Sequence, residues 1–195
     1  MNPRDRAPHD LPARTLRGIG VAWILAAVWG CAATPHPTTS PTSQPTTDAT
    51  MQAFQDSGGL IRLEYPAQFT AKHDPDYVLS ANADGQTFTL DIPALPPHIP
   101  DMIPLGLVVN GYKNDLKKIH PDVKIDEPPA PAVPKAQGRE LRSTWEQDHV
   151  PTTELAMLLV HGDHVFIVRI VMPSDRLTAG QAVFDDIVGS LHFLK

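Results

Sequence analysis

TTELAMLLVHGDHVFIVRIVM, residues 152–172, carries the clearest evidence for the fold of this chain. It contains two apolar runs, residues 155–160 and 165–168, which do not alternate with polar residues. The dipeptide Gly162-Asp163 separates the two strand-like segments as a short turn. Uninterrupted apolar runs of this length are typical of central strands that are covered on both faces. The stretch therefore predicts a hairpin in the middle of a sheet.

A second hairpin is predicted upstream. Alternating apolar positions in residues 77–81 and 86–92 flank the segment Asn-Ala-Asp-Gly at 82–85. An Asp-Gly turn between two segments of period two is a strong hairpin signal. We expect further strands at residues 60–65, 123–125 and 138–147, and a short closing strand at 191–194.

Two helices complete the predicted order. Apolar residues recur at helical spacing from Leu105 to Ile119, between Pro104 and Pro121. The second helix carries an apolar stripe from Phe184 to Leu191, and Thr178-x-x-Gln181 predicts a capping box at its start. Consecutive strands with short turns and two helices predict an α+β fold, a mainly antiparallel twisted β-sheet packed between helices as an α/β/α sandwich.

Proline is concentrated in two predicted loops. Residues 126–135 read DEPPAPAVPK, and residues 93–100 hold four more prolines. Such segments favour extended, polyproline-like backbone, which loses little entropy on binding. If the protein has a partner surface, we expect it at these two loops.

The N-terminal thirty residues have the pattern of an export signal. Residues 1–17 carry four arginines against two aspartates, and residues 18–33 carry no charge. The uncharged segment is shorter than the roughly 20 apolar residues of a membrane-spanning helix. It fits the apolar region of a secretory signal peptide. We therefore predict that the protein is exported.

Cys31 follows this apolar segment directly, after Val28-Trp29-Gly30. This arrangement resembles the lipobox of bacterial lipoproteins, with Trp29 in place of the usual small residue. The resemblance implies a lipoprotein signal peptide at 1–30 and lipidation of Cys31. Ordinary cleavage after a small-x-small site, an uncleaved anchor and a misassigned start codon are the alternatives. Residues 31–50, rich in Thr, Pro and Ser, predict a disordered tether.

Charge and cysteine content exclude several classes of protein. The 195 residues include 16 Lys+Arg and 22 Asp+Glu, a net charge of −6 that becomes −8 without residues 1–30. This balance argues against a nucleic-acid binder, which needs a basic face, and against adhesion to anionic lipids. Membrane attachment would therefore come from the lipid on Cys31. A single cysteine excludes an intramolecular disulfide and a cysteine-based zinc cluster.

Residues 51–195 as a whole resemble a known superfamily. The opening Leu63-Glu64-Tyr65-Pro66, the helix before Pro121, the meander 138–172 and the close FDDIVGSLHF, residues 184–193, carry the likeness. They resemble the PsbP-like superfamily, which includes the extrinsic photosystem protein PsbP, a Ran-binding nuclear import factor and many bacterial lipoproteins. The resemblance implies a twisted antiparallel sheet between helices. It also implies a binding or accessory role rather than catalysis.

His161, Asp163 and His164 are the candidate metal ligands of the sequence. They cluster at the predicted 161–164 turn, and imidazole and carboxylate groups bind transition metals. A tight turn flanked by two histidines explains the same residues without a metal. No serine-hydrolase, zinc-protease or phosphate-loop motif is present in the sequence.

These observations lead to one functional hypothesis with two alternatives. We expect a lipid-anchored, non-enzymatic binding or accessory module of the bacterial cell envelope, with no cofactor and an unidentified envelope protein or small molecule as its partner. An exported metal-dependent enzyme that uses His161, Asp163 and His164 is the first alternative. A purely structural envelope protein is the second.

Overall fold

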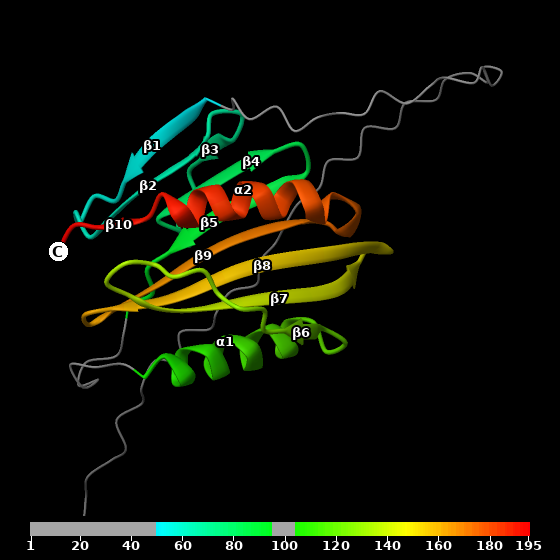
Figure 1. Cartoon of the computed structure of the whole chain (residues 1–195). Helices are drawn as coiled ribbons and strands as arrows, with labels where there is room; N and C mark the ends of the chain where they lie inside the picture. Colours follow the sequence, from blue (N-terminus) through cyan, green and yellow to red (C-terminus); the bar gives the residue numbers. More distant parts are fainter. Residues whose placement is uncertain (1–49, 95–103) are drawn as a thin grey trace, which may run out of the picture. The chain divides into compact units, whose positions relative to one another are not determined.

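The computed structural model describes residues 50–94 and 104–195. These residues form two antiparallel sheets and two helices, which confirms the predicted α+β class (Figure 1). The predicted signal peptide, Cys31 and nearly all of the tether lie outside the described residues. No helix within 50–94 and 104–195 has both the length and the apolar character needed to cross a membrane.

The large sheet has seven strands, and every neighbouring pair is antiparallel. Their spatial order is β3 (Thr70–Lys72), β4 (Leu79–Ala83), β5 (Gln86–Asp91), β9 (His164–Pro173), β8 (Val150–His161), β7 (Gln137–Gln147) and β6 (Lys124–Asp126). The predicted hairpin β8–β9 therefore lies inside the sheet. Residues 152–160 of β8 are buried without interruption, as expected for a strand covered on both faces.

The β4–β5 hairpin confirms the Asp-Gly prediction. Asp84 and Gly85 have φ of 46° and 74°, the left-handed pair that a tight hairpin turn requires. Leu79 pairs with Leu90, and both side chains are buried. The first strand begins at Leu79, two residues later than predicted, and Tyr77 lies outside it with its ring against the guanidinium of Arg169.

The helices α1 (Leu105–Ile119) and α2 (Leu177–Gly189) cover opposite faces of the large sheet (Figure 1). The predicted capping box of α2 is wrong. A 3-10 turn, η1 (Ser174–Arg176), leads straight into the helix, so Thr178 is already helical and makes no cap hydrogen bond. Gln181 instead reaches across to β7.

A small second sheet, in the order β1-β2-β10, was not predicted. It consists of β1 (Met51–Gln55), β2 (Ile61–Pro66) and β10 (His192–Phe193). The Asp56 carboxylate fixes the β1–β2 turn by accepting hydrogen bonds from the amides of Gly58, Leu60 and Ile61. The predicted strand at 191–194 is confirmed as β10, which brings the C-terminal segment against β2.

The main hydrophobic core lies between the large sheet, α2 and β2. It contains Phe88, Phe166 and Phe184, all nearly inaccessible to solvent. A separate and smaller apolar cluster lies under α1 and includes Val109 and Leu158. The sheet thus has one heavily apolar face and one mixed face.

Candidate functional site

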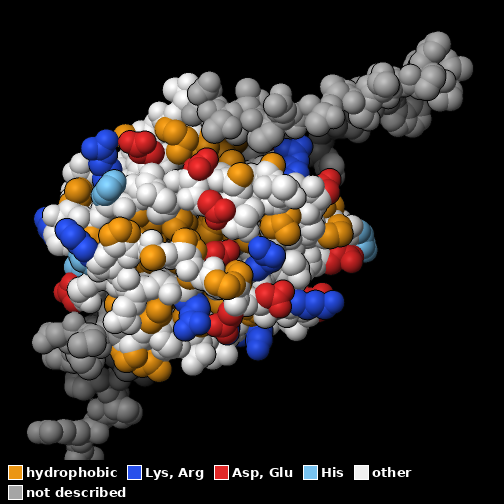
Figure 2. Space-filling view, in the orientation of Figure 1, with side chains coloured by type: hydrophobic (Ala, Val, Ile, Leu, Met, Phe, Trp, Pro, Cys, Tyr) orange, Lys and Arg blue, Asp and Glu red, His pale blue; other side chains and the backbone are white. Residues whose placement is uncertain are grey.

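A recess of about 400 Å³ lies between the proline-rich loop, β7 and α2. Its walls are residues 128–131 of the loop, Glu140 and Arg142 of β7, and Gln181 and Asp185 of α2. The loop crosses the sheet beside α2 (Figure 1). On this face of the molecule, apolar side chains form a band among acidic and basic groups (Figure 2). This recess is the candidate binding site.

The local fold explains why polar residues meet at this place. Residues 140 and 142 of β7 point to the α2 side of the sheet, since their partners Met157 and Leu155 belong to the main core. The helix α2 packs over β8 and β9, so β7 is left to the loop. The loop is held down by Val133, which is buried in the same core. The recess is the gap between α2 and the proline-rich loop, which cover neighbouring parts of the same sheet face.

A hydrogen-bonded chain links the strand wall of the recess to the helix wall. Arg142 Nη2 donates to Gln181 Oε1 at 3.1 Å. Gln181 Nε2 in turn donates to Asp185 Oδ1 at 2.9 Å. The Nε of Arg142 is buried and has no hydrogen-bond partner among the described residues. The guanidinium is therefore held against α2 with part of its donor capacity unused.

Glu140 is the buried carboxylate of the recess, with 4% of its surface exposed. No Lys, Arg or His of residues 50–94 and 104–195 lies within ion-pair distance of it. Burial raises the pKa of Glu140, and the charge of Asp185 adds to the effect. The amide of Gln181 and the charge of Arg142 lower this pKa without cancelling the rise. The ionised form of Glu140 is therefore poorly compensated inside the protein.

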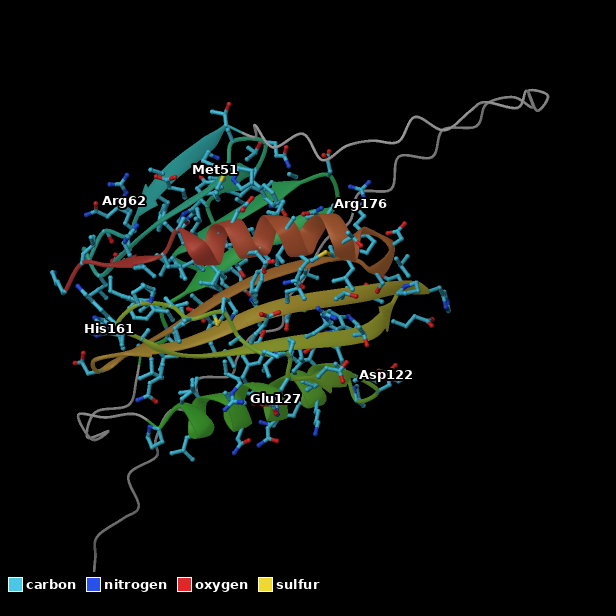
Figure 3. All side chains as sticks on the ribbon, viewed as in Figure 1. Met51, Arg62, Asp122, Glu127, His161 and Arg176 are labelled. Carbon is cyan, nitrogen blue, oxygen red and sulfur yellow. The ribbon has the colours of Figure 1, made fainter. Side chains whose placement is uncertain are left out.

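The three predicted metal ligands lie near the β8–β9 turn, but the structure engages them separately. His161 Nδ1 lies 2.6 Å from the carbonyl oxygen of Lys135, and Nε2 lies 2.7 Å from the main-chain oxygen of Lys195. Its ring also stacks on Phe193, with 4.4 Å between the ring centroids. His161 thus ties the end of the proline-rich loop to the C-terminal segment (Figure 3).

His164 and Asp163 form a separate pair. His164 Nδ1 lies 2.5 Å from Asp163 Oδ1, and the Asp163 side chain is largely exposed. Within the described ranges of the chain, no group of three or more His, Cys, Asp or Glu is arranged to hold a metal ion. Cys31, the predicted lipidation site, lies outside these ranges.

A buried polar network on the opposite face was missed by sequence reasoning. Tyr112 of α1 donates from its hydroxyl to Glu154 Oε1 at 2.8 Å, and Arg169 Nη1 lies 3.9 Å from Glu154 Oε2. Arg169 also donates to Thr89 Oγ1 at 2.8 Å and to the hydroxyl of Tyr77. Burial raises the pKa of Glu154, while Arg169 and Tyr112 lower it. The sequence did hold a signal for this pairing, since Glu154 and Arg169 are single charges within the apolar strands β8 and β9.

No family model and no curated protein matches this chain. Solved structures match across most of the chain. LpqN of Mycobacterium tuberculosis is 11% identical, with a TM-score of 0.52 over 75% of this chain and 91% of that one. Cyanobacterial PsbP of Synechocystis sp. PCC 6803 is 13% identical, with a TM-score of 0.42 over 78% and 98% of the two chains. PA94 of Pseudomonas aeruginosa is 12% identical, with a TM-score of 0.46 over 69% and 91%.

These identities limit the likeness to the fold. LpqN is the one of these three whose TM-score exceeds one half, and it supports the α+β sandwich. The loop 126–135, where we expect a partner surface if the protein has one, forms one wall of the recess. The other predicted loop, at 93–100, lies mostly outside the described residues.

Proposed function

We propose that this protein is a non-enzymatic binding or accessory module of the bacterial cell envelope, held at a membrane by a lipid on Cys31. The recess between the proline-rich loop, β7 and α2 is the observation that carries the binding role. It combines a stiff apolar wall with polar groups whose hydrogen-bonding capacity is partly unused. Such a combination is typical of ligand sites, where a few polar groups fix the orientation of what binds.

The proposed location rests on the leader and on the fold. The net positive N-terminus, the uncharged segment and Cys31 follow in the order of a lipoprotein signal. LpqN, which shares the fold, is described as involved in cell envelope biogenesis of Mycobacterium tuberculosis. A tether of about twenty residues rich in Pro and Thr would hold the domain away from the membrane.

The intact mass of the native mature protein and its membrane partition test the anchor. We expect a chain that begins at Cys31, carries added acyl mass and is found with the membrane. The Cys31→Ser variant should lose the acyl mass and leave the membrane. An unmodified soluble chain that begins near Thr34 would contradict the anchor. The protein would then be a free secreted domain.

A further inference from the structure

The proline-rich loop gives the recess a wall with more hydrogen-bond acceptors than donors. Pro128, Pro129 and Pro131 have carbonyl oxygens but no backbone N–H. Near the loop's end, the amide of Ala136 donates to the carbonyl of Val133. The three prolines therefore offer a ligand apolar rings and acceptor oxygens, and no backbone donor.

The floor of the recess adds the carboxylate of Glu140, which has no cation within ion-pair distance in the described part of the chain. A buried ionised carboxylate is costly unless it is paired and hydrogen-bonded. Glu154, on the other face of the sheet, has Tyr112 and Arg169 as partners. Glu140 is buried nearly as deeply, yet the guanidinium of Arg142 is turned to Gln181 instead. Glu140 therefore lacks the close cation that Glu154 has in Arg169, and an ammonium group in the recess would supply one.

The charges that line the recess agree with this requirement. Glu140 and Asp185 are acidic and Arg142 is basic, so the lining is net negative. The oxygen Asp185 Oδ1 accepts one hydrogen bond from Gln181, and a carboxylate has capacity for more. The tether cannot supply the missing cation, because residues 34–50 contain no Lys or Arg. The four arginines of residues 1–17 are removed with the proposed signal peptide, so we take the occupant to come from another molecule.

We propose that the recess binds an alkylammonium group, with Glu140 as its counter-ion and the proline rings of 128–131 against its hydrocarbon stem. This inference rests on the proposed binding function and names its ligand class. Long cationic side chains bury their methylene stems on apolar surfaces while the charged head finds polar partners. The volume of about 400 Å³ is sufficient for one such side chain. The source is either a free amine or a Lys side chain of a partner protein.

Amine titrations of the native mature protein, in detergent if it is membrane-bound, test this inference. The two probes are pentane-1,5-diamine and the peptide acetyl-Ala-Lys-Ala-amide, each followed by backbone amide NMR shifts. The uncharged control is the same peptide with norleucine in place of lysine. We expect saturable shifts at residues 128–131, 140–142 and 181–185 with at least one cationic probe and none with the norleucine peptide. Saturation by the peptide alone indicates a protein partner, and saturation by the diamine alone indicates a small amine.

Three variants decide which group holds the cation. Glu140→Gln keeps the shape of the side chain and should raise the Kd at least tenfold. Glu146→Gln makes the same change in an exposed residue of the same strand and should leave the Kd unchanged. Asp185→Asn changes an exposed residue of α2 and should raise the Kd by less than Glu140→Gln does. This variant tests the site if Glu140→Gln does not fold.

Two outcomes would overturn the inference. One is the absence of saturable shifts with both cationic probes. The other is binding of a cationic probe that survives Glu140→Gln with an unchanged Kd, since Glu140 is then not the counter-ion. A lipidated chain that binds neither amine would support the proposed lipid anchor and refute the proposed ligand class. A soluble chain that binds amines through Glu140 would refute the proposed lipid anchor and support the proposed ligand class.

Discussion

The two faces of the seven-stranded sheet are stabilised in different ways. On the face of α2, buried side chains from the sheet, α2 and β2 form one large apolar cluster. On the face of α1, the buried apolar residues are few, and a polar network of Tyr112, Glu154 and Arg169 lies beside them. Apolar burial is non-directional, whereas a buried network works only with correct geometry. We therefore expect the first face to provide most of the stability and the second to fix the position of α1.

Truncation in the main core should have the largest effect. Phe184→Ala empties a site at the centre of α2 that is fully buried. Deletion of a buried Phe side chain typically costs about 3–5 kcal/mol, because both transfer free energy and cavity terms add. Leu116→Ala, on α1, should cost about 2 kcal/mol, the low end for a buried Leu. Urea denaturation measures both free energies, and equal losses would contradict the assignment of stability to the α2 face.

Removal of one hydroxyl tests the polar face. Tyr112→Phe deletes the donor to Glu154 Oε1, and hydrogen bonds to charged groups contribute about 1.5–3 kcal/mol. Tyr65→Phe is the matched control on the α2 face, where the ring packs on Phe88. Burial raises the pKa of Tyr65, and its hydroxyl makes no hydrogen bond to a side chain within residues 50–94 and 104–195. A loss in Tyr65→Phe as large as in Tyr112→Phe would show that the network contributes nothing specific.

The same contrast explains what the sequence could predict. The large core follows from apolar patterns, so the hairpins β4–β5 and β8–β9 and both helices were expected from residue order alone. The recess could not be predicted from apolar patterns alone. The loop 126–135 was identified as a candidate surface, but the approach of Glu140 and Arg142 to α2 depends on the strand order in space. The strands β1 and β3 were missed because both are short edge strands with little apolar periodicity.

The close packing of α2 on β9 gives a third prediction. A Cβ on Gly180 would lie 2.1 Å from Met172 Sδ, and Met172 is itself buried, with 1% of its surface exposed. Overpacking of this kind costs about 1–3 kcal/mol, so Gly180→Ala should destabilise the domain. Gly189→Ala, at the last residue of the same helix, meets no atom within 4 Å and should be neutral or slightly stabilising. Thermal unfolding of the pair separates packing from helix propensity, and a neutral Gly180→Ala would mean that α2 can shift on the sheet.

A pH dependence separates the two buried carboxylates, and its effect is smallest at Glu140. The pKa of Glu140 in the folded protein is raised above its ordinary value of 4.5. Its contribution to stability is therefore complete below that value and is lost as the pH rises through the folded pKa. Glu140→Gln removes this loss, so the variant should gain stability relative to the wild type between pH 4.5 and neutral pH.

Glu154→Gln should behave in the opposite way at neutral pH. The pKa of Glu154 is also raised by burial, so its own ionisation costs stability as the pH rises. The substitution nevertheless removes the charge beside Arg169 and leaves that buried cation without its carboxylate. We expect this second effect to dominate, because an unpaired buried charge is strongly destabilising. Urea denaturation of both variants across this pH range checks the contrast, and parallel curves would show that Glu140 is as well paired as Glu154.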